Sequence, residues 1–266
     1  MTNKLVICFD FDETLGSFSQ LYKFWELIKT FLKNKTLDKR YFFNILDTFP
    51  LIFRPNIFKL LRLIKDKKKK NICDYVYIYT NNNGPKFWVS LFIDYIHYKL
   101  NYNLFDKIIR AYKINGRIIE RGRTSHDKSY KDMITCTQLP KNSKVLFYDD
   151  QMHNYMKNNS NVQYIHAIPY NYNLNYGKMT LMFYYNNLNL FKNINVEAFK
   201  KYIHKYIQYD MIYLEKSEID KKTDYLITEN FIKEFNSFIY ENTRQNKRNI
   251  TYKKKIKNHN ITYKKS

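Results

Sequence analysis

The segment Leu5–Leu15 constrains the fold of this chain more than any other. Its first five residues, Leu5–Phe9, are apolar and of strand length, and they end abruptly at Asp10, Asp12 and Thr14. An apolar strand of this kind is typical of the interior of a parallel sheet. Open α/β sheets bind ligands at the carboxyl ends of their strands, so this pair of carboxylates would face a ligand. The alternative is a surface Asp pair that merely closes a strand.

Two further apolar segments end in the same way, and they favour the ligand site over the surface pair. These segments are Tyr75–Tyr79, followed by Thr80 and Asn81, and Val145–Tyr148, followed by Asp149 and Asp150. A fourth strand is expected at Val162–Ile168, before Pro169. Since the carboxyl ends of parallel strands meet at one edge of a sheet, we expect these polar residues to share one crevice.

Segments with helical spacing of apolar residues separate the strands. The predicted helices are Phe18–Lys33, Lys39–Leu46, Pro55–Lys70, Phe87–Leu100 and Ser129–Cys136. Lys107–Glu120 is predicted to be a β-hairpin that turns at Asn115-Gly116. Alternating strands and helices predict an α/β fold, a three-layer α/β/α sandwich around a central parallel sheet.

The chain divides into a core, a helical extension and a tail. We expect the core over 1–175, with a helical insertion at 17–53 that forms either a small lid or part of the packing on the sheet. The extension, 176–242, contains predicted amphipathic helices at Val196–Ile207 and Glu229–Tyr240. Residues 243–266 include nine Lys or Arg and no acidic residue, so we expect a disordered basic tail.

The net charge and the cysteine content indicate which partners and which cellular compartment suit this chain. The net charge of +22 would attract polyanions such as nucleic acid, although a solvated basic surface fits it equally well. Cys8, Cys73 and Cys136 have no disulfide or metal spacing, which suggests buried thiols in a reducing compartment. We expect no membrane span and no secretory signal, and therefore an intracellular protein, cytoplasmic or nuclear.

The crevice would gather carboxylates that repel one another unless a cation binds between them. Asp10, Asp12, Asp149 and Asp150 supply oxygen ligands, and few histidines lie near them in the sequence. Oxygen ligands of this kind favour Mg²⁺ over zinc, so we expect a magnesium site. His126 and His153 flank these segments, and neither is assigned a role.

These segments resemble the four motifs of the haloacid dehalogenase (HAD) superfamily. The resemblance rests on Asp10–Thr14, on Thr80, on a lysine before the third apolar strand, and on Asp149-Asp150, and it covers roughly residues 4 to 170. Within the superfamily, two further segments are similar to the branch of NLI-interacting-factor-like, carboxy-terminal-domain phosphatases. They are Arg54-Pro55 and Tyr130–Met133.

The resemblance implies a Mg²⁺-dependent phosphatase that works through an aspartyl-phosphate. Asp10 would be the nucleophile, and Asp12 would protonate the leaving group and then deprotonate water. Thr80, Asn81 and Lys131 would bind the phosphoryl oxygens, with Lys128 as the substitute for Lys131.

The resemblance also implies a set of metal ligands. Mg²⁺ would be held by Asp10, by the backbone carbonyl of Asp12, and by Asp149, with Asp150 binding directly or through water. Glu13 is expected to point away from the site.

Two classes of function remain open at this point. The first is a phosphatase whose substrate is a phosphoprotein, a nucleotide or the phosphate end of a polynucleotide. The second is a catalytically silent HAD-like interaction module with a nucleic-acid-binding tail. Retention of both Asp10 and Asp12 favours the enzyme.

Overall fold

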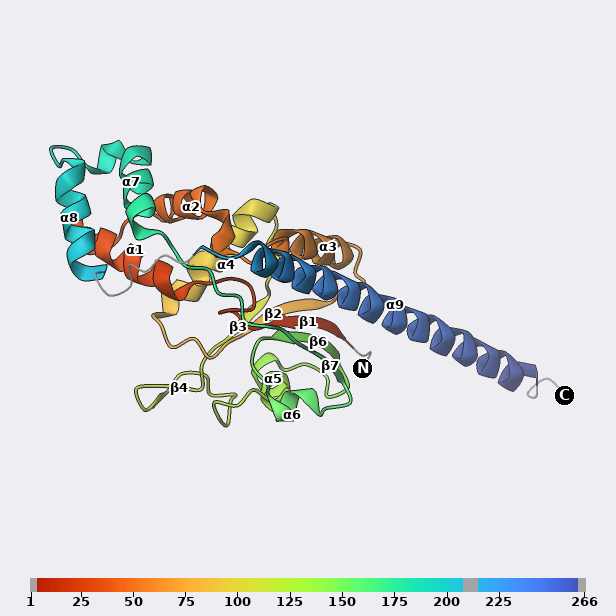
Figure 1. Ribbon diagram of the computed structural model, residues 1–266. Coiled ribbons are helices and arrows are strands. Elements are labelled where there is room, and N and C mark those ends of the chain that lie inside the picture. Colours follow the sequence, from red (N-terminus) through yellow and green to blue (C-terminus); the bar gives the residue numbers. More distant parts are fainter. Residues whose placement is uncertain (1–3, 208–214, 263–266) are drawn as a thin grey trace.

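A computed structural model describes residues 4–207 and 215–262 of the chain (Figure 1). Its centre is a five-stranded sheet in the order β3-β2-β1-β6-β7, with every neighbouring pair parallel. The strands are β1 (Leu5–Phe9), β2 (Tyr75–Tyr79), β3 (Lys107–Ile109), β6 (Lys144–Asp149) and β7 (Val162–His166). The predicted α/β fold with a central parallel sheet is confirmed.

The strand order places a topological switch point beside β1. The chain moves outward from β1 through β2 and β3, and it then returns to the other side of β1 for β6 and β7. Such a reversal opens a crevice at the carboxyl ends of the two strands that flank it. Phe9 pairs with Tyr148, which places the next residues, Asp10 and Asp149, side by side at this edge.

Helices cover both faces of the sheet, which completes the three layers (Figure 1). One face carries α1 (Ser19–Phe31), α2 (Lys39–Thr48), α3 (Ile57–Lys69) and α4 (Lys86–Leu100). The other face carries α5 (Tyr130–Thr137) and α6 (Asn154–Lys157). Successive residues of β1 alternate between the two cores: Ile7 belongs to the first and Cys8 to the second.

The insertion at 17–53 packs on the core. Phe42 of α2 is fully buried, with its ring centroid 5.5 Å from that of Trp88 and 5.1 Å from that of Phe92, both on α4. A short 3-10 helix, η1 (Pro50–Ile52), ends the insertion. Of the two alternatives for this segment, packing on the core accounts for most of its aromatic residues.

The hairpin predicted over Lys107–Glu120 is only partly correct. β4 (Lys113–Ile114) and β5 (Arg117–Ile118) do form a two-residue hairpin, with positive φ at both turn residues, Asn115 and Gly116. Lys107–Ile109, however, is β3 and pairs in parallel with β2. The open edge of β2 supplies a partner distant in sequence, and local spacing cannot reveal such a pairing.

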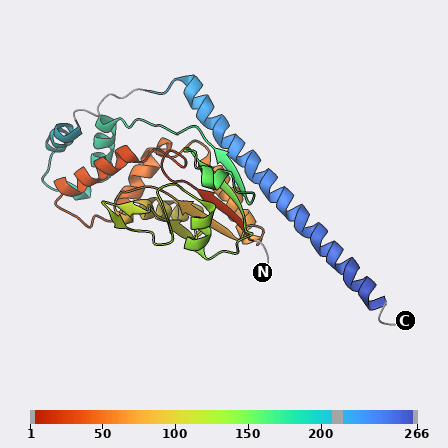
Figure 2. The ribbon, with the colours of Figure 1, turned by 90° about the horizontal axis from the view of Figure 1, so that it is seen from below.

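The extension consists of α7 (Tyr176–Asn186), a 3-10 helix η2 (Leu188–Leu190), α8 (Val196–Ile207) and α9 (Glu218–Thr262). The predicted bounds of α8 are confirmed. α9 is far longer than predicted and projects beyond the core (Figure 2). Residues 243–262, for which we expected a disordered tail, belong to this helix: no Gly or Pro interrupts them, and Lys and Arg are good helix formers. Residues 263–266 lie outside the described residues.

The first part of α9 is anchored to the core. Phe231 and Phe235 are buried, and the Tyr148 hydroxyl donates a hydrogen bond to the backbone carbonyl of Phe231 at 2.9 Å. Within the described ranges, no helix is long and apolar enough to cross a bilayer.

Candidate active site

A cavity of about 430 Å³ opens at the carboxyl ends of β1, β2 and β6. We call this cavity the crevice. Its lining combines carboxylates, amides, hydroxyls, one lysine and two aromatic rings: Asp10, Asp12, Glu13, Ser19, Tyr22, Thr80, Asn81, Asn82, Asn83, Gly84, Trp88, Lys128, Asp150 and Gln151. Of the strand-end residues predicted to share one crevice, Asp10, Asp12, Thr80, Asn81 and Asp150 line it, whereas Asp149 is fully buried beneath it and contacts Lys128.

Lys128 links two carboxylates at the base of the crevice. Its Nζ donates a short hydrogen bond to Asp10 Oδ1 and a second one, of 2.8 Å, to Asp149 Oδ2. Burial alone would lower the pKa of Lys128, but the two carboxylates outweigh it and raise that pKa. Burial raises the pKa of Asp10, and the nearby Asp149 raises it further, while Lys128 opposes both. The lysine therefore stays charged and compensates part of the buried negative charge.

Asp150 is fixed by the loop that follows β1. Thr14 Oγ1 donates a hydrogen bond to Asp150 Oδ1 at 2.8 Å, and it also accepts one from the Asp150 backbone N–H at 3.1 Å. Asp10, Asp149 and Asp150 each place a carboxylate oxygen within 4.8 Å of the others. These three carboxylates are close enough together to hold a metal ion.

Asp12 lies apart from that carboxylate cluster. Its Oδ2 accepts a hydrogen bond of 2.7 Å from Asn82 Nδ2, and its backbone carbonyl accepts one of 2.7 Å from the Thr14 N–H. Burial raises the pKa of Asp12 to about 6, although the bond from Asn82 acts to lower it. The metal ligand predicted for Asp12 is this backbone carbonyl and not the side chain, so the absence of its carboxylate from the cluster of Asp10, Asp149 and Asp150 does not bear on that prediction.

Thr80 and Asn81 both line the crevice, as predicted. The Thr80 hydroxyl oxygen accepts a hydrogen bond from the Asn82 N–H at 2.9 Å, which leaves the hydroxyl hydrogen available as a donor. Asn81 Oδ1 accepts a bond of 2.9 Å from Arg123. No role was predicted for Asn82 or Arg123, although Asn82 stands in the polar run that follows β2.

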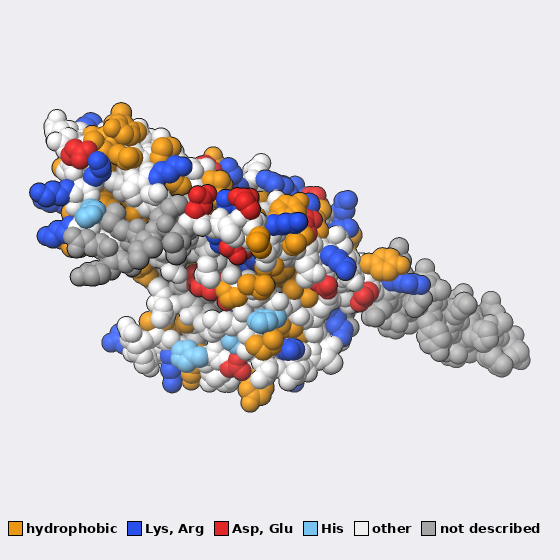
Figure 3. All heavy atoms as spheres, in the orientation of Figure 1, with side chains coloured by type: hydrophobic (Ala, Val, Ile, Leu, Met, Phe, Trp, Pro, Cys, Tyr) orange, Lys and Arg blue, Asp and Glu red, His pale blue; other side chains and the backbone are white. Residues whose placement is uncertain are grey.

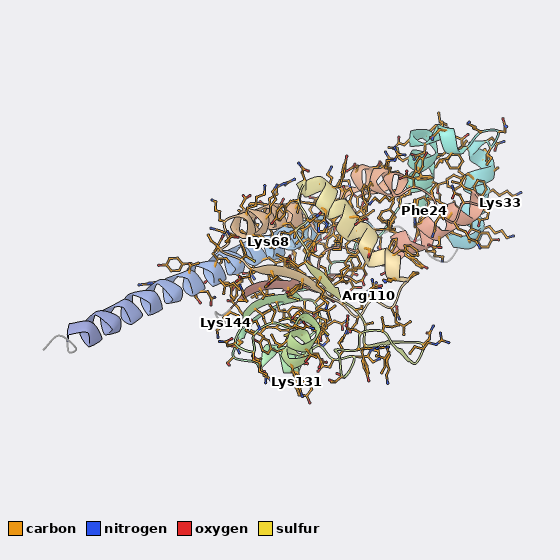
Figure 4. All side chains as sticks on the ribbon, turned by 180° about the vertical axis from the view of Figure 1, so that it is seen from behind. Phe24, Lys33, Lys68, Arg110, Lys131 and Lys144 are labelled. Atoms are coloured by element: carbon orange, nitrogen blue, oxygen red, sulfur yellow. The ribbon has the colours of Figure 1, made fainter. Side chains whose placement is uncertain are left out.

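The prediction of Lys131 as the phosphate-binding lysine is wrong. Lys131 lies in the first turn of α5 and is exposed on the outer side of that helix (Figure 4). Lys128, its substitute, is only 2% exposed and touches Asp10. The physical reason is the helix start: Ser129 caps α5, so Lys128 precedes the helix and reaches the crevice, whereas Lys131 follows the cap and faces solvent.

Glu13 does not point away from the site as expected, because it lines the crevice. Its φ of 59° is left-handed, and this turns the chain sharply after Asp12. The Glu13 carbonyl accepts hydrogen bonds from Arg54 at 2.6 Å and from the Tyr170 N–H at 2.8 Å. Hydrogen bonds from Arg54 and from the Tyr170 backbone therefore hold the loop after β1 in place.

Two buried arginines support the crevice from outside it. Arg54 is 1% exposed and also donates to the carbonyls of Thr14 and Ile168, at 2.8 and 2.9 Å. Arg123 donates to the carbonyls of Thr80 and Arg110, at 3.2 and 2.8 Å. Arg54 is not among the residues that line the cavity. It therefore stabilises the backbone around the site and does not contact a ligand in the crevice.

The two histidines near these segments differ in placement. His153 is buried, with Nδ1 against Asp127 Oδ1 and Nε2 3.7 Å from Asp149 Oδ2. His126 is exposed, with its ring edge-on to Tyr112. Neither ring lines the crevice.

Charge is dispersed over the coloured part of one face of the molecule (Figure 3). On the face drawn in Figure 3, Lys and Arg side chains are scattered among neutral residues. This face does not present one continuous basic patch.

In comparisons with known proteins, no family model, curated protein or solved structure matched the chain.

Proposed function

We propose that this protein is a Mg²⁺-dependent phosphatase of the HAD type, which hydrolyses a phosphomonoester through an aspartyl-phosphate. The observation that carries the proposal is the arrangement around Asp10. Its carboxylate lies at a topological switch point, next to Lys128 and in a cluster with Asp149 and Asp150, while Asp12 lies in the same cavity with its own amide partner. A purely structural strand end needs none of these partners.

The residues present fit a magnesium ion. Asp10, Asp149 and Asp150 would hold it, because they supply only hard oxygen donors and their oxygens lie within 4.8 Å of one another. When bound, Mg²⁺ would neutralise charge on the phosphoryl oxygens.

The residues of the crevice can divide the reaction between them. An Asp10 carboxylate oxygen attacks phosphorus, the bond from phosphorus to the leaving oxygen breaks, and Asp12 gives its proton to that oxygen. Water then attacks phosphorus, Asp12 takes the proton, and the bond between Asp10 and phosphorus breaks to release phosphate. The pKa of about 6 for Asp12 suits both transfers near neutral pH.

One cation and one hydroxyl group would bind the transferred phosphoryl group. Lys128 and the hydroxyl of Thr80 line the same cavity as Asp10 and can donate to phosphoryl oxygens. They act on charge that is redistributed in the transition state, which is the main demand of phosphoryl transfer.

The test is hydrolysis of p-nitrophenyl phosphate by the purified chain with and without Mg²⁺. We expect turnover that needs the metal and that falls by at least about 10³-fold in Asp10→Asn. The matched control is Asp94→Asn, which removes an exposed carboxylate on α4 that pairs with Lys39. An Asp10→Asn variant as active as the control would exclude the proposed mechanism, and absence of turnover in every form would favour the silent interaction module.

A further inference from the structure

A second cavity, also of about 430 Å³, adjoins the crevice. We call it the side cavity. Four residues of the loop after β2, namely Thr80, Asn82, Asn83 and Gly84, line both cavities. A molecule whose phosphate lies in the crevice can therefore extend along this loop into the side cavity.

The side cavity differs from the crevice in chemistry. Its other lining residues are five aliphatic side chains and two cations: Pro85, Val89, Ile108, Ile114, Ile119, Lys86 and Arg110. The crevice, in contrast, contains four carboxylates. The side cavity therefore suits an aliphatic group that has negative charge next to it.

Its two cations are available to such a charge. Lys86 is exposed, and Arg110 donates a long hydrogen bond of 3.4 Å to the Lys86 carbonyl. Within residues 4–207 and 215–244, whose side chains are described, neither cation forms an ion pair with a carboxylate. Figure 4 shows Arg110 just after β3, at the edge of the sheet where the strands end.

We propose that the side cavity binds the polypeptide that flanks the phosphorylated residue of a phosphoprotein, with an aliphatic side chain in the cavity and acidic residues at Lys86 and Arg110. This inference rests on the proposed phosphatase activity, and it assigns the substrate class. The β4–β5 hairpin forms one wall, through Ile114 and Ile119.

The apolar lining of the side cavity and the negative charge of the crevice favour a peptide over a nucleic acid end. Bases of single strands bind by stacking on aromatic rings, and none of the described residues that line the side cavity is aromatic. Further phosphates of a polynucleotide would also meet the carboxylates of the crevice, where Lys128 is the one cation among the described lining residues. An aliphatic side chain, by contrast, fits walls of Val and Ile.

The first experiment compares phosphoserine peptides as substrates of the full chain with Mg²⁺. One peptide has Leu on both sides of phosphoserine and Glu beyond them; a second replaces Leu with Ser, and a third replaces Glu with Lys. We expect kcat/KM for the first peptide to exceed that for each of the others by about tenfold or more, mainly through KM. Equal values for all three would overturn the proposal.

The second experiment tests the cavity itself with matched variants. Ile119→Asp places a charge in the side cavity, whereas Ile118→Asp alters the more exposed neighbour that does not line it. Lys86→Glu is compared with Lys113→Glu in the same way. We expect Ile119→Asp and Lys86→Glu to raise KM for the Leu and Glu peptide by about tenfold, and all four variants to hydrolyse p-nitrophenyl phosphate normally.

Binding separates this inference from the proposed activity. Anisotropy of the labelled first peptide on Asp10→Asn with Mg²⁺ reports the side cavity without turnover. If Ile119→Asp weakens this binding, the peptide site in the side cavity is supported even if no form of the protein hydrolyses p-nitrophenyl phosphate. Normal hydrolysis of p-nitrophenyl phosphate with no effect of Ile119→Asp on the peptide, or a preference for a 5′-phosphorylated oligonucleotide, would refute it.

Discussion

The base of the crevice and the aromatic layer between α1, α7 and α8 are both buried, but different interactions stabilise them. In the crevice, Lys128 and a set of carboxylates compensate one another through charge. In the aromatic layer, Phe24 of α1 packs against Tyr176 and Phe183 of α7 with ring centroids 6.2 and 6.3 Å apart. Burial of charged groups costs solvation free energy, whereas burial of aromatic rings is favourable. The second region therefore stabilises the fold, and under the proposed function the first would supply the chemistry.

The largest effect should come from the aromatic layer. Phe24→Ala removes a fully buried ring and leaves a cavity, so we expect a loss of about 3–5 kcal/mol in the free energy of unfolding. The measurement is denaturant unfolding, with kcat of the remaining folded protein unchanged. A large fall in kcat with an unchanged free energy of unfolding would mean that the aromatic layer contributes to activity and not to stability.

The next effect should come from the crevice. Lys128→Met removes the cation between Asp10 and Asp149, and we expect kcat/KM on p-nitrophenyl phosphate to fall by about 10²–10³-fold. Lys131→Met is the matched control, because this exposed lysine of α5 lies outside the crevice. Equal losses in the two variants would mean that the crevice lysine has been misassigned.

A smaller effect is expected from the amide that orients Asp12. Asn82→Ala removes the hydrogen bond of 2.7 Å to the Asp12 carboxylate, and we expect kcat to fall about tenfold with little change in melting temperature. Asn83→Ala is the control, since this exposed neighbour lines the same cavity. A lower melting temperature with unchanged kcat would give Asn82 a structural role only.

The smallest effect concerns a titratable group outside the crevice. Burial lowers the pKa of His97 from its ordinary value of 6.5, and its Nε2 accepts the Phe105 N–H at 3.1 Å. Because the folded pKa is lowered, this contribution to stability is present above 6.5 and is lost as the pH falls below it. The melting temperature of His97→Gln should therefore decline less than that of the parent between about pH 7 and about pH 5. Parallel declines would contradict this.

Local patterns predicted the elements that depend on local residues. β1 and β2 have the predicted bounds, because continuous apolar runs that end in polar residues are typical of buried parallel strands. β3 was missed, because its three residues pair with a strand distant in sequence and look locally like one arm of the hairpin. The length of α9 was also missed, since composition alone favoured disorder over a helix.

In the candidate site, too, local sequence predicted only the side chains whose positions depend on local structure. The placement of Asp10, Asp149 and Asp150 followed from strand ends that share one edge. The choice between Lys128 and Lys131 did not, because both precede or begin the same helix and only the cap at Ser129 separates them. Arg123 was not predictable, since it contacts backbone carbonyls from segments far apart in the chain.

The sequence by itself determined which residues form strands and which chemistry stands at their ends, because apolar runs and the carboxylates that follow them are local features. Only the tertiary structure decided that Lys128 reaches Asp10, that Asn82 holds Asp12, and that an aliphatic cavity adjoins the crevice. These contacts depend on the strand order and on where each helix begins, and packing between distant segments sets both.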